Sequence, residues 1–491
     1  MGLGFGHGAV RAQNNVVGTW DAPVSLQVEG VHGAVLPNGK VLYVPHRFNP
    51  GGMTSSVVFD PNDPGNARYV TVPENYFCGG HTMLSDGRLL FNGGETLAPN
   101  ELTGAGYFDY RTETWTVVGA MNRRRWYPST FQLGDGSIWT FGGQNEAADE
   151  TSNDPTIESF DVATGQWSMV GGEGIPGQYL EAYNRLHLMP DGKLFQSGHL
   201  PATYLYDPVA KTWAFVDNTD LNRARGNGSS VRLQDGRIFI VGGEDKILYF
   251  NSAEVIDLTQ PNPRWQSVAS MSAARAFIDA IVLPDGNVLV LGGDEGTGSA
   301  LRTPELYDPA ANTWTNMAQF QIPRGYHSTT LLLPDGRVIV SGGEGQGGPG
   351  IFGESPDYEI WNPYYLFKTP RPVINSLPTE AGYGTQLSMP YTSSVPVSHV
   401  VIHRSGSQTH SFSYNQISLP VNFDSNSGSS VTFTVPNNPN LLPPNYYMVF
   451  LMSQDGVPSV ARWLRIGAGL GDIFADGFEA GNVSAWTAVF P

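Results

Sequence analysis

The hydrophobic and polar positions of this chain follow one pattern that recurs along most of its length. A short apolar run is followed by Asp-Gly or Asn-Gly, and a second apolar run then often ends at Gly-Gly. This arrangement predicts a β-hairpin, because the tight turn suits Asp or Asn followed by glycine. The residues before the turn glycine are Asn38, Asp86, Asp135, Asp191, Asp235, Asp285 and Asp335.

A second motif follows most of these hairpins and predicts two further strands. It reads GYFDYRTETW, ESFDVATGQW, TYLYDPVAKTW and PELYDPAANTW. Four strands that recur every 44 to 56 residues are typical of kelch-type β-propeller blades, whereas tandem β-sandwiches would lack this period. We therefore predict a seven-bladed kelch-type β-propeller over residues 17–366. Its motif tryptophans should pack between neighbouring blades: Trp115, Trp167, Trp213 and Trp314.

The repeat stops after KTPRPVINSLP, and the pattern changes to alternating apolar and polar residues. This alternation predicts an immunoglobulin-like β-sandwich over residues 371–468, so the whole chain is expected to be all-β. Residues 469–491 are interpreted as a C-terminal tail. Residues 1–16 are interpreted as the remnant of a signal peptide, because AVRAQ resembles the small-residue end of one. The protein is therefore expected to be secreted or periplasmic.

Composition narrows the possible partners. The 59 glycines, 36 prolines and 15% charged residues suit many short strands and tight turns rather than helices. A net charge of −18 argues against nucleic acid as a partner, because phosphates would be repelled. No apolar run of about 18 residues is present, so we expect no membrane span. We expect a monomer.

The candidate chemistry follows from the repeat. The first strand of each blade lines the channel of a propeller, so residues at one register of different blades should converge on its axis. The register eight residues before the turn Asp holds Cys78, Tyr127, Tyr183, Asn227, Phe277 and His327, and Tyr326 directly precedes the last of these.

Two observations make this register a candidate redox site rather than ordinary core. Cys78 is the only cysteine, and Tyr127 is expected at the same level of the next blade, where it could be near enough to react with the thiol. Tyr326 and His327 could supply an oxygen and a nitrogen to one metal, and such ligands suit Cu(II) better than zinc or magnesium. Taken singly, each tyrosine could equally be a core residue with a satisfied hydroxyl, and Cys78 could be an inert buried thiol.

Several segments resemble the copper radical oxidases, the galactose oxidase and glyoxal oxidase family. They are YFCGGHTMLSDGRLLFNGG, RRRWYPSTFQLGDGSIWTFGG, RGYHSTTLLLPDGRVIVSGG and, in the second domain, SQTHSFSYNQISLPV with YYMVFLMSQDGVPSVARWLRI. The resemblance covers about residues 17–468.

The resemblance implies a thioether bond between Cys78 and Tyr127, which forms a redox cofactor within the protein. It also implies one copper per chain, held by Tyr127, His327 and His410 in the equatorial plane and by Tyr326 in the axial position. Tyr326 would be the base and Tyr127 the radical that abstracts hydrogen from the substrate. The implied reaction oxidises a primary alcohol or hydrated aldehyde with O2 and yields H2O2.

The chain also departs from galactose oxidase. Asn145 stands where that enzyme stacks a tryptophan over the cross-link, and Glu181 aligns near its sugar-binding arginine, with Arg185 a few residues further on. Small aldehydes or simple primary alcohols are therefore the expected substrates, as in glyoxal oxidases. Tyr183 and Phe277 are candidates to line the pocket on register alone.

Two other functions remain open at this point. One is a non-catalytic kelch propeller that binds carbohydrate or mediates adhesion, and the other is a hydrolase with Cys78 as nucleophile beside a histidine. The remaining histidines carry less weight. His81 is expected to point away from Cys78 in a strand, and His199, His399 and His403 are expected at the surface or in turns.

Overall fold

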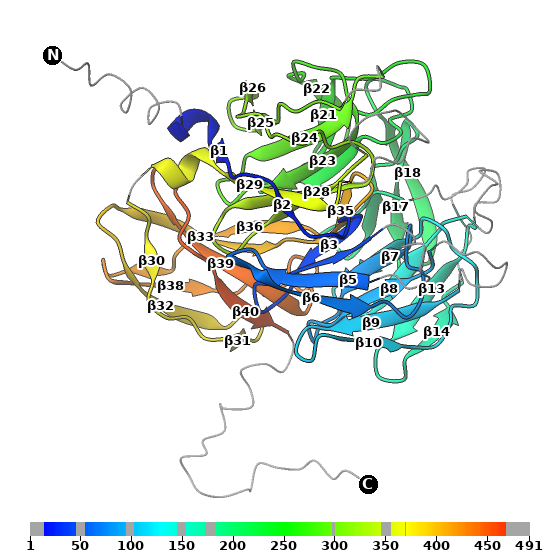
Figure 1. Cartoon of the computed structure of the whole chain (residues 1–491), viewed down its shortest axis with the longest axis horizontal. Coiled ribbons are helices and arrows are strands. Elements are labelled where there is room, and N and C mark those ends of the chain that lie inside the picture. Colours follow the sequence, from blue (N-terminus) through cyan, green and yellow to red (C-terminus); the bar gives the residue numbers. More distant parts are fainter. Residues whose placement is uncertain are drawn as a thin grey trace, which may run out of the picture.

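The computed structural model describes residues 14–45, 55–94, 103–144, 154–171, 174, 183–296, 300–344, 355–368 and 370–467. Nearly all of the regular structure in these residues is β-strand, as predicted. Figure 1 shows the propeller sheets, coloured from blue through green to the yellow of the last blade, on one side of the sandwich strands, coloured yellow to red. Among the described residues, no helix has the length and apolar character that crossing a membrane requires.

The first six repeats each form an antiparallel sheet whose four blade strands pair in chain order, so the predicted blades are confirmed. Blades 1 to 3 are β3 (His32–Val35), β4 (Val41–Val44), β5 (Ser55–Asp60) and β6 (Asp63–Thr71); β7 (Gly80–Met83), β8 (Leu89–Asn92), β9 (Ala105–Asp109) and β10 (Thr114–Val117); and β11 (Ser129–Gln132), β12 (Ile138–Phe141), β13 (Ile157–Asp161) and β14 (Gln166–Met169). Blades 4 to 6 are β15 (Leu186–Leu188), β16 (Leu194–Gln196), β17 (Ala202–Asp207) and β18 (Thr212–Asn218); β19 (Ser229–Arg232), β20 (Ile238–Val241), β21 (Ala253–Ile256) and β22 (Trp265–Val268); and β23 (Ala276–Val282), β24 (Val288–Asp294), β25 (Glu305–Asp308) and β26 (Thr313–Asn316).

The seventh blade combines both ends of the propeller and closes the ring. It consists of β27 (Ser328–Leu332), β28 (Val338–Gly342) and β29 (Asp357–Asn362), with the short N-terminal strands β1 (Thr19–Trp20) and β2 (Val24–Ser25) paired to β29. Because the outer strand comes from the start of the chain, the first and last parts of the propeller are hydrogen-bonded together. A 3-10 turn, η1 (Tyr364–Phe367), leads out of the blade towards the sandwich.

The predicted Asp-Gly and Asn-Gly turns all form, with a different geometry from the two-residue hairpin turn. Only the glycine of each pair has positive φ, between 83° and 91°. In the first blade the Gly39 N–H donates to the Leu36 carbonyl and the Leu36 N–H donates to the Lys40 carbonyl, both at 2.8 Å. This is a type I turn followed by a left-handed glycine. The residue before the glycine therefore keeps negative φ, and a carboxylate or amide there can accept the N–H two residues on, as Asp86 does from Arg88.

Each of four blades contains a buried ion pair that the pattern analysis did not single out. The arginines lie two or three residues before the channel register, and each guanidinium donates to a glutamate on the third strand of its own blade. Each pair is almost fully buried, so the charges compensate one another inside the sheet stack. The pairs are Arg125–Glu158 (3.1 Å), Arg225–Glu254 (2.6 Å), Arg275–Glu305 (2.6 Å) and Arg324–Glu359 (3.3 Å).

The second domain has its own core between two facing sheets. Its strands are β30 (Val373–Ile374), β31 (Glu380–Ala381), β32 (Gln386–Thr392), β33 (Val397–Arg404), β36 (Ile417–Val421), β37 (Ser425–Asn426), β38 (Ser430–Thr434), β39 (Asn445–Ser453) and β40 (Arg462–Ile466). Buried apolar side chains from both sheets, such as Val400, Phe433 and Val449, fill the space between them. This is the predicted sandwich.

One hairpin leaves the sandwich and enters the propeller channel. Strands β34 (Ser407–Thr409) and β35 (Phe412–Tyr414) pair with each other, and β34 pairs with β3 of blade 1, with Thr409 opposite His32. The hairpin thus extends the inner edge of the first blade, and Figure 1 shows β35 among the propeller strands. The residues at its tip therefore come from a segment that the sandwich domain supplies.

Candidate metal centre

The register predicted from the repeat has a distinctive backbone conformation. Cys78, Tyr127, Tyr183, Asn227, Phe277 and His327 all have φ between 48° and 69°. Residues other than glycine rarely adopt this left-handed conformation, and where they do the strain is often found at functional sites. The Tyr127 N–H donates to the Cys78 carbonyl and the Tyr183 N–H to the Tyr127 carbonyl, both at 2.8 Å. These bonds link the register from blade to blade.

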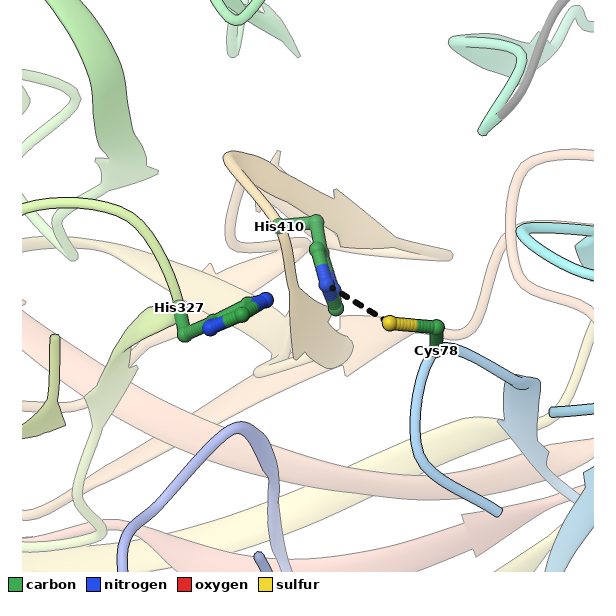
Figure 2. A group of neighbouring side chains, drawn as sticks. All are labelled: Cys78, His327 and His410. Atoms are coloured by element: carbon green, nitrogen blue, oxygen red, sulfur yellow. Dashed lines mark hydrogen bonds between the residues drawn. The ribbon is translucent and has the colours of Figure 1, made fainter. Parts of the chain in front are cut away.

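His410 reaches the same place from the channel hairpin. It lies at the tip between β34 and β35, where His410 and Ser411 both have positive φ (44° and 70°). Figure 2 shows His410 between Cys78 and His327, with its ring directed at the sulfur. The His410 Nε2 lies 3.4 Å from the Cys78 Sγ, and the ligand atoms of these three buried residues all lie within 4.8 Å of one another.

The two candidate tyrosines bring their hydroxyl groups to this cluster. The phenol oxygens of Tyr127 and Tyr326 are 2.7 Å apart, although the residues are 199 positions apart in sequence. Tyr127 also packs against the small cluster that contains Cys78 and Phe77. The ring of His410 is surrounded by other rings, with centroid distances of 4.6 Å to His327, 5.1 Å to Tyr127 and 5.3 Å to Tyr326. The structure therefore brings together all five residues that were predicted to form the site.

The electrostatics of the cluster keep both phenols protonated in the absence of a cation. Burial, followed by the nearby Cys78 and Tyr326, raises the pKa of Tyr127 well above its ordinary value. Burial and Cys78 likewise raise the pKa of Tyr326. A phenolate at either position needs a positive charge close by, which a bound metal cation would supply.

Both histidines are held so that Nε2 is the atom available for a ligand bond. The Nδ1 of His410 lies 2.6 Å from the Thr409 hydroxyl, which itself donates to the Val31 carbonyl at 3.0 Å. That hydroxyl must then accept from Nδ1–H, which fixes the tautomer with a lone pair on Nε2. The Nδ1 of His327 lies 3.3 Å from the Glu344 carboxylate, an arrangement typical of metal-bound histidines.

A buried carboxylate ties the segments that carry the two histidines to one another. Asp279 of β23 accepts hydrogen bonds from Ser328 (3.0 Å) and Thr330 (2.9 Å) of β27, and from Gln408 (2.8 Å) of β34. Ser328 directly follows His327, and Gln408 lies two residues before His410. Asp279 therefore fixes the strand of one histidine relative to the hairpin of the other.

Tyr127 is covered by an aromatic ring that was not predicted from the sequence. The indole of Trp126 is stacked on the phenol of Tyr127, with centroids 4.2 Å apart and planes 24° from parallel. On the other side, the ring of Tyr183 lies 4.8 Å from that of Tyr127, and its hydroxyl donates to the Gly79 carbonyl. Phe277 stands edge-on to Tyr326 at 5.2 Å. The only sequence signal for Trp126 was its position next to Tyr127 in RRRWYPS.

The other residues discussed from the sequence lie elsewhere. Arg185 is buried and donates to the Arg225 carbonyl, and His81 lies 3.4 Å from His32 through their Nδ1 atoms. The expectation for His403 was wrong, because this residue is buried in β33, where desolvation lowers its pKa to about 3. His199 and His399 are partly buried. Asn145, Glu181, the predicted tail and most of the N-terminal remnant lie outside the described residues.

The cluster has the chemical make-up of a copper site. Two imidazole nitrogens and two phenol oxygens converge in a buried space, and this mixed nitrogen and oxygen set suits Cu(II). The aspartates and glutamates typical of magnesium or calcium sites are not among the converging ligand atoms of the described residues. The residues present therefore fit one copper ion.

Comparison with known families and structures agrees with this geometry. Residues 249–348 match the family described as glyoxal oxidase N-terminus, residues 371–466 match the galactose oxidase-like Early set domain, and residues 225–272 match the kelch motif.

Among curated proteins, a galactose oxidase from Gibberella zeae is 27% identical over 92% of this chain and 71% of its own length. An aldehyde oxidase, GLOX, from Vitis pseudoreticulata is 27% identical over 93% of this chain and 99% of its own length. Among solved structures, a fungal alcohol oxidase in complex with copper superposes with a TM-score of 0.81 and 26% identity, over 92% of this chain and 99% of that one. These similarities extend over the propeller, the channel hairpin and the sandwich alike. In both of its domains the chain is therefore similar to proteins of the galactose oxidase and glyoxal oxidase family.

Proposed function

We propose that this protein is a copper radical oxidase that oxidises small aldehydes or primary alcohols with O2 and releases H2O2. The observation that carries the proposal is the convergence of one thiol, two phenols and two imidazoles from distant segments at one end of the propeller channel. A non-catalytic binding propeller has no need for this set. The similarity to galactose oxidase, to aldehyde oxidase GLOX and to a copper-bound alcohol oxidase supports the same function.

Four side chains would hold the copper. Tyr127, Tyr326, His327 and His410 are proposed as its ligands. When bound, copper supplies a one-electron acceptor and a Lewis acid for the substrate oxygen. The hydrogen bonds that the two imidazoles donate to Thr409 and Glu344 would hold both rings with Nε2 towards the metal.

The second one-electron acceptor is proposed to be the protein itself. A C–S bond between Cys78 and the ring of Tyr127 would replace one S–H and one aromatic C–H bond, with the two hydrogens and two electrons passing to O2. The closeness of Cys78 to the phenol of Tyr127 supports this bond. The sulfur would spread the unpaired electron of a Tyr127 radical over a larger system.

The reaction then divides between the two tyrosines. Tyr326 takes the proton of the substrate hydroxyl, and Tyr127 takes a hydrogen atom from the adjacent carbon. These two steps remove two protons and one electron from the substrate, and the copper would accept the second electron. The total of two electrons and two protons matches the reduction of one O2 to H2O2. For an aldehyde the reacting form is the hydrate, and the product is the acid.

The residues around the proposed site favour aldehydes and simple alcohols over galactose as substrates. The described rings near the phenols are Trp126, Tyr183 and Phe277. The carboxylate of Glu344 beside His327 disfavours substrates that carry their own negative charge. We therefore propose a small neutral substrate. We also propose that the protein is exported and acts as a monomer.

A peroxide-coupled assay tests the proposal. Copper-loaded protein under air is offered glyoxal, methylglyoxal, glycerol, benzyl alcohol and galactose, beside metal-free protein and the Cys78→Ser variant. We expect copper-dependent H2O2 with the aldehydes or simple alcohols, and little with galactose. Binding of sugars without peroxide from any substrate would instead favour the adhesion alternative.

A further inference from the structure

A small pocket, with a cavity volume of about 30 Å³, lies at the base of the channel, at the opposite end of the blades from the metal centre. It lies between the first strands of blades 3 to 5, the foot of the channel hairpin and the sandwich domain. Polar residues in its wall include Gln132, His187, Arg232, Arg404 and Asn415. None of the five candidate site residues contributes to the wall, so this pocket is separate from the proposed active site.

Two of these wall residues carry positive charge without a carboxylate. Arg404, the last residue of β33, is buried and donates from Nη1 to Gln132 Oε1 at 2.8 Å. Its Nη2 is buried and makes no hydrogen bond within 3.5 Å among the described residues, although the Tyr447 hydroxyl lies near the guanidinium. Arg232, the last residue of β19, donates to the Leu188 carbonyl at 3.3 Å. Neither arginine forms an ion pair in the part of the chain that the structure describes, and no aspartate or glutamate lines the pocket.

This arrangement contrasts with the rest of the propeller. The guanidinium groups of Arg125, Arg225, Arg275 and Arg324 are buried and each donates to a glutamate. A buried charge without a counter-charge costs several kcal/mol, and a desolvated donor that makes no hydrogen bond adds to that cost. Burial lowers the pKa of both Arg232 and Arg404, which reflects the same unfavourable environment. A negative charge in the pocket would remove the imbalance.

We propose that this pocket binds a small inorganic anion, between chloride and sulfate or phosphate in size, through the guanidinium groups of Arg232 and Arg404. Guanidinium groups donate well to halides and oxyanions, and the side-chain amides of Gln132 and Asn415 add polar groups to the wall. The chain carries a net charge of −18, so its overall field repels anions and the attraction must come from these local groups.

The position of the site suggests what the anion does. Arg232 belongs to blade 5 of the propeller, whereas Arg404 belongs to the sandwich and lies six residues before His410. An anion held by both would join the two domains at the foot of the hairpin that carries His410. It would thereby stabilise the docking of the hairpin without contacting the metal.

Thermal unfolding of the purified full chain tests the proposal. The midpoint temperature is measured at increasing sodium chloride and, separately, sodium sulfate for the wild type, Arg404→Met and Arg232→Met. Arg237→Met is the matched control, because Arg237 lies in the exposed turn of the same blade and pairs with Asp235. The wild type and the control should show the same saturable rise. In the two pocket variants the half-saturating concentration should increase about tenfold, the effect of losing one charge-assisted hydrogen bond.

Two results would overturn the proposal. One is an identical salt dependence in all four proteins, which would indicate a general salt effect. The other is the absence of bromide from the pocket in anomalous diffraction data from wild-type crystals soaked in sodium bromide. Bromide within hydrogen-bond distance of Arg404 would support the site, and this measurement does not require that either pocket variant folds.

Discussion

The indole of Trp126 lies against the phenol of Tyr127, with ring centroids 4.2 Å apart and planes 24° from parallel. The resemblance to galactose oxidase placed Asn145 where that enzyme has the tryptophan that covers its cross-link. In the described structure the preceding residue in the chain supplies such a ring instead. Trp126 is thus the residue best placed to shield a radical on Tyr127 from solvent and reductants.

Replacing Trp126 by leucine should shorten the lifetime of the oxidised, radical form. Loss of the aromatic contact, worth about 1 kcal/mol, predicts a decay faster by roughly tenfold or less. The decay is followed by the optical and electron paramagnetic resonance signals after oxidation. Trp115→Phe is the control, because Trp115 stacks on Tyr76 within blade 2, away from the site. Equal decay rates in both variants would contradict the shielding role.

Replacing Thr409 by valine should weaken copper binding by about 10- to 100-fold, because His410 loses the hydroxyl that fixes its tautomer. Copper affinity is measured by competition with a chelator. Thr329→Val is the matched control, since its buried hydroxyl also donates to a backbone carbonyl, that of Gly30, without contacting a histidine. A similar loss of affinity in the control would mean that the effect is general destabilisation.

Replacing Tyr326 by phenylalanine should lower kcat by about 10² to 10⁴, because the substrate hydroxyl loses its proton acceptor. The Cys78–Tyr127 bond should still form, since Tyr326 takes no part in it. Steady-state kinetics and intact mass measure the two effects separately. Tyr183→Phe removes only a hydroxyl that donates to Gly79 and should affect kcat far less. A Tyr326→Phe enzyme with unchanged kcat would remove this tyrosine from the mechanism.

The raised pKa of Asp279 should make the stability of the folded protein depend on pH. Burial raises its pKa from 3.8 to about 7, against the lowering effect of hydrogen bonds from Thr330, Ser328 and Gln408. The native state therefore holds a proton between pH 4 and 7 that the unfolded chain releases. Stability from this group is complete below about pH 4 and is lost as the pH rises through 7.

Urea unfolding of the wild type and Asp279→Asn from pH 4 to 9 measures this contribution. The wild type should lose up to a few kcal/mol relative to the variant as the pH rises to 7, since each pKa unit corresponds to about 1.4 kcal/mol. Asp161→Asn is the control, because the pKa of this exposed carboxylate is lowered and it titrates below this range. A constant difference between wild type and Asp279→Asn would mean that Asp279 is ionised throughout.

The propeller and its register could be predicted because the turn of each hairpin gives a fixed point from which positions along the first strand of each blade can be counted. Each residue eight positions before the turn Asp lies at the same level of the channel, and the structure gives all six the same left-handed backbone. The buried arginines could also have been predicted from the repeat, because they precede the register by two or three residues in four blades. The exact domain limits, 17–366 and 371–468, stay predictions.

The remaining features depend on contacts that no periodicity encodes. His410 followed only from family resemblance, since nothing in the sandwich pattern indicates that β34 adds to blade 1. Trp126 and Tyr127 are adjacent, and in a regular strand their rings would point to opposite faces. The positive φ of Tyr127 breaks that alternation and allows the stack. The wrong expectation for His403 arose because a histidine within an apolar strand can be buried without a charge partner.

Intact mass spectrometry after copper loading under air tests the central claim most directly. A bond between the sulfur of Cys78 and the ring of Tyr127 predicts a loss of two hydrogens and one linked peptide that contains both residues. Neither should be found in Cys78→Ser. An unchanged mass in the wild type, or the same loss in the variant, would contradict the proposed cofactor.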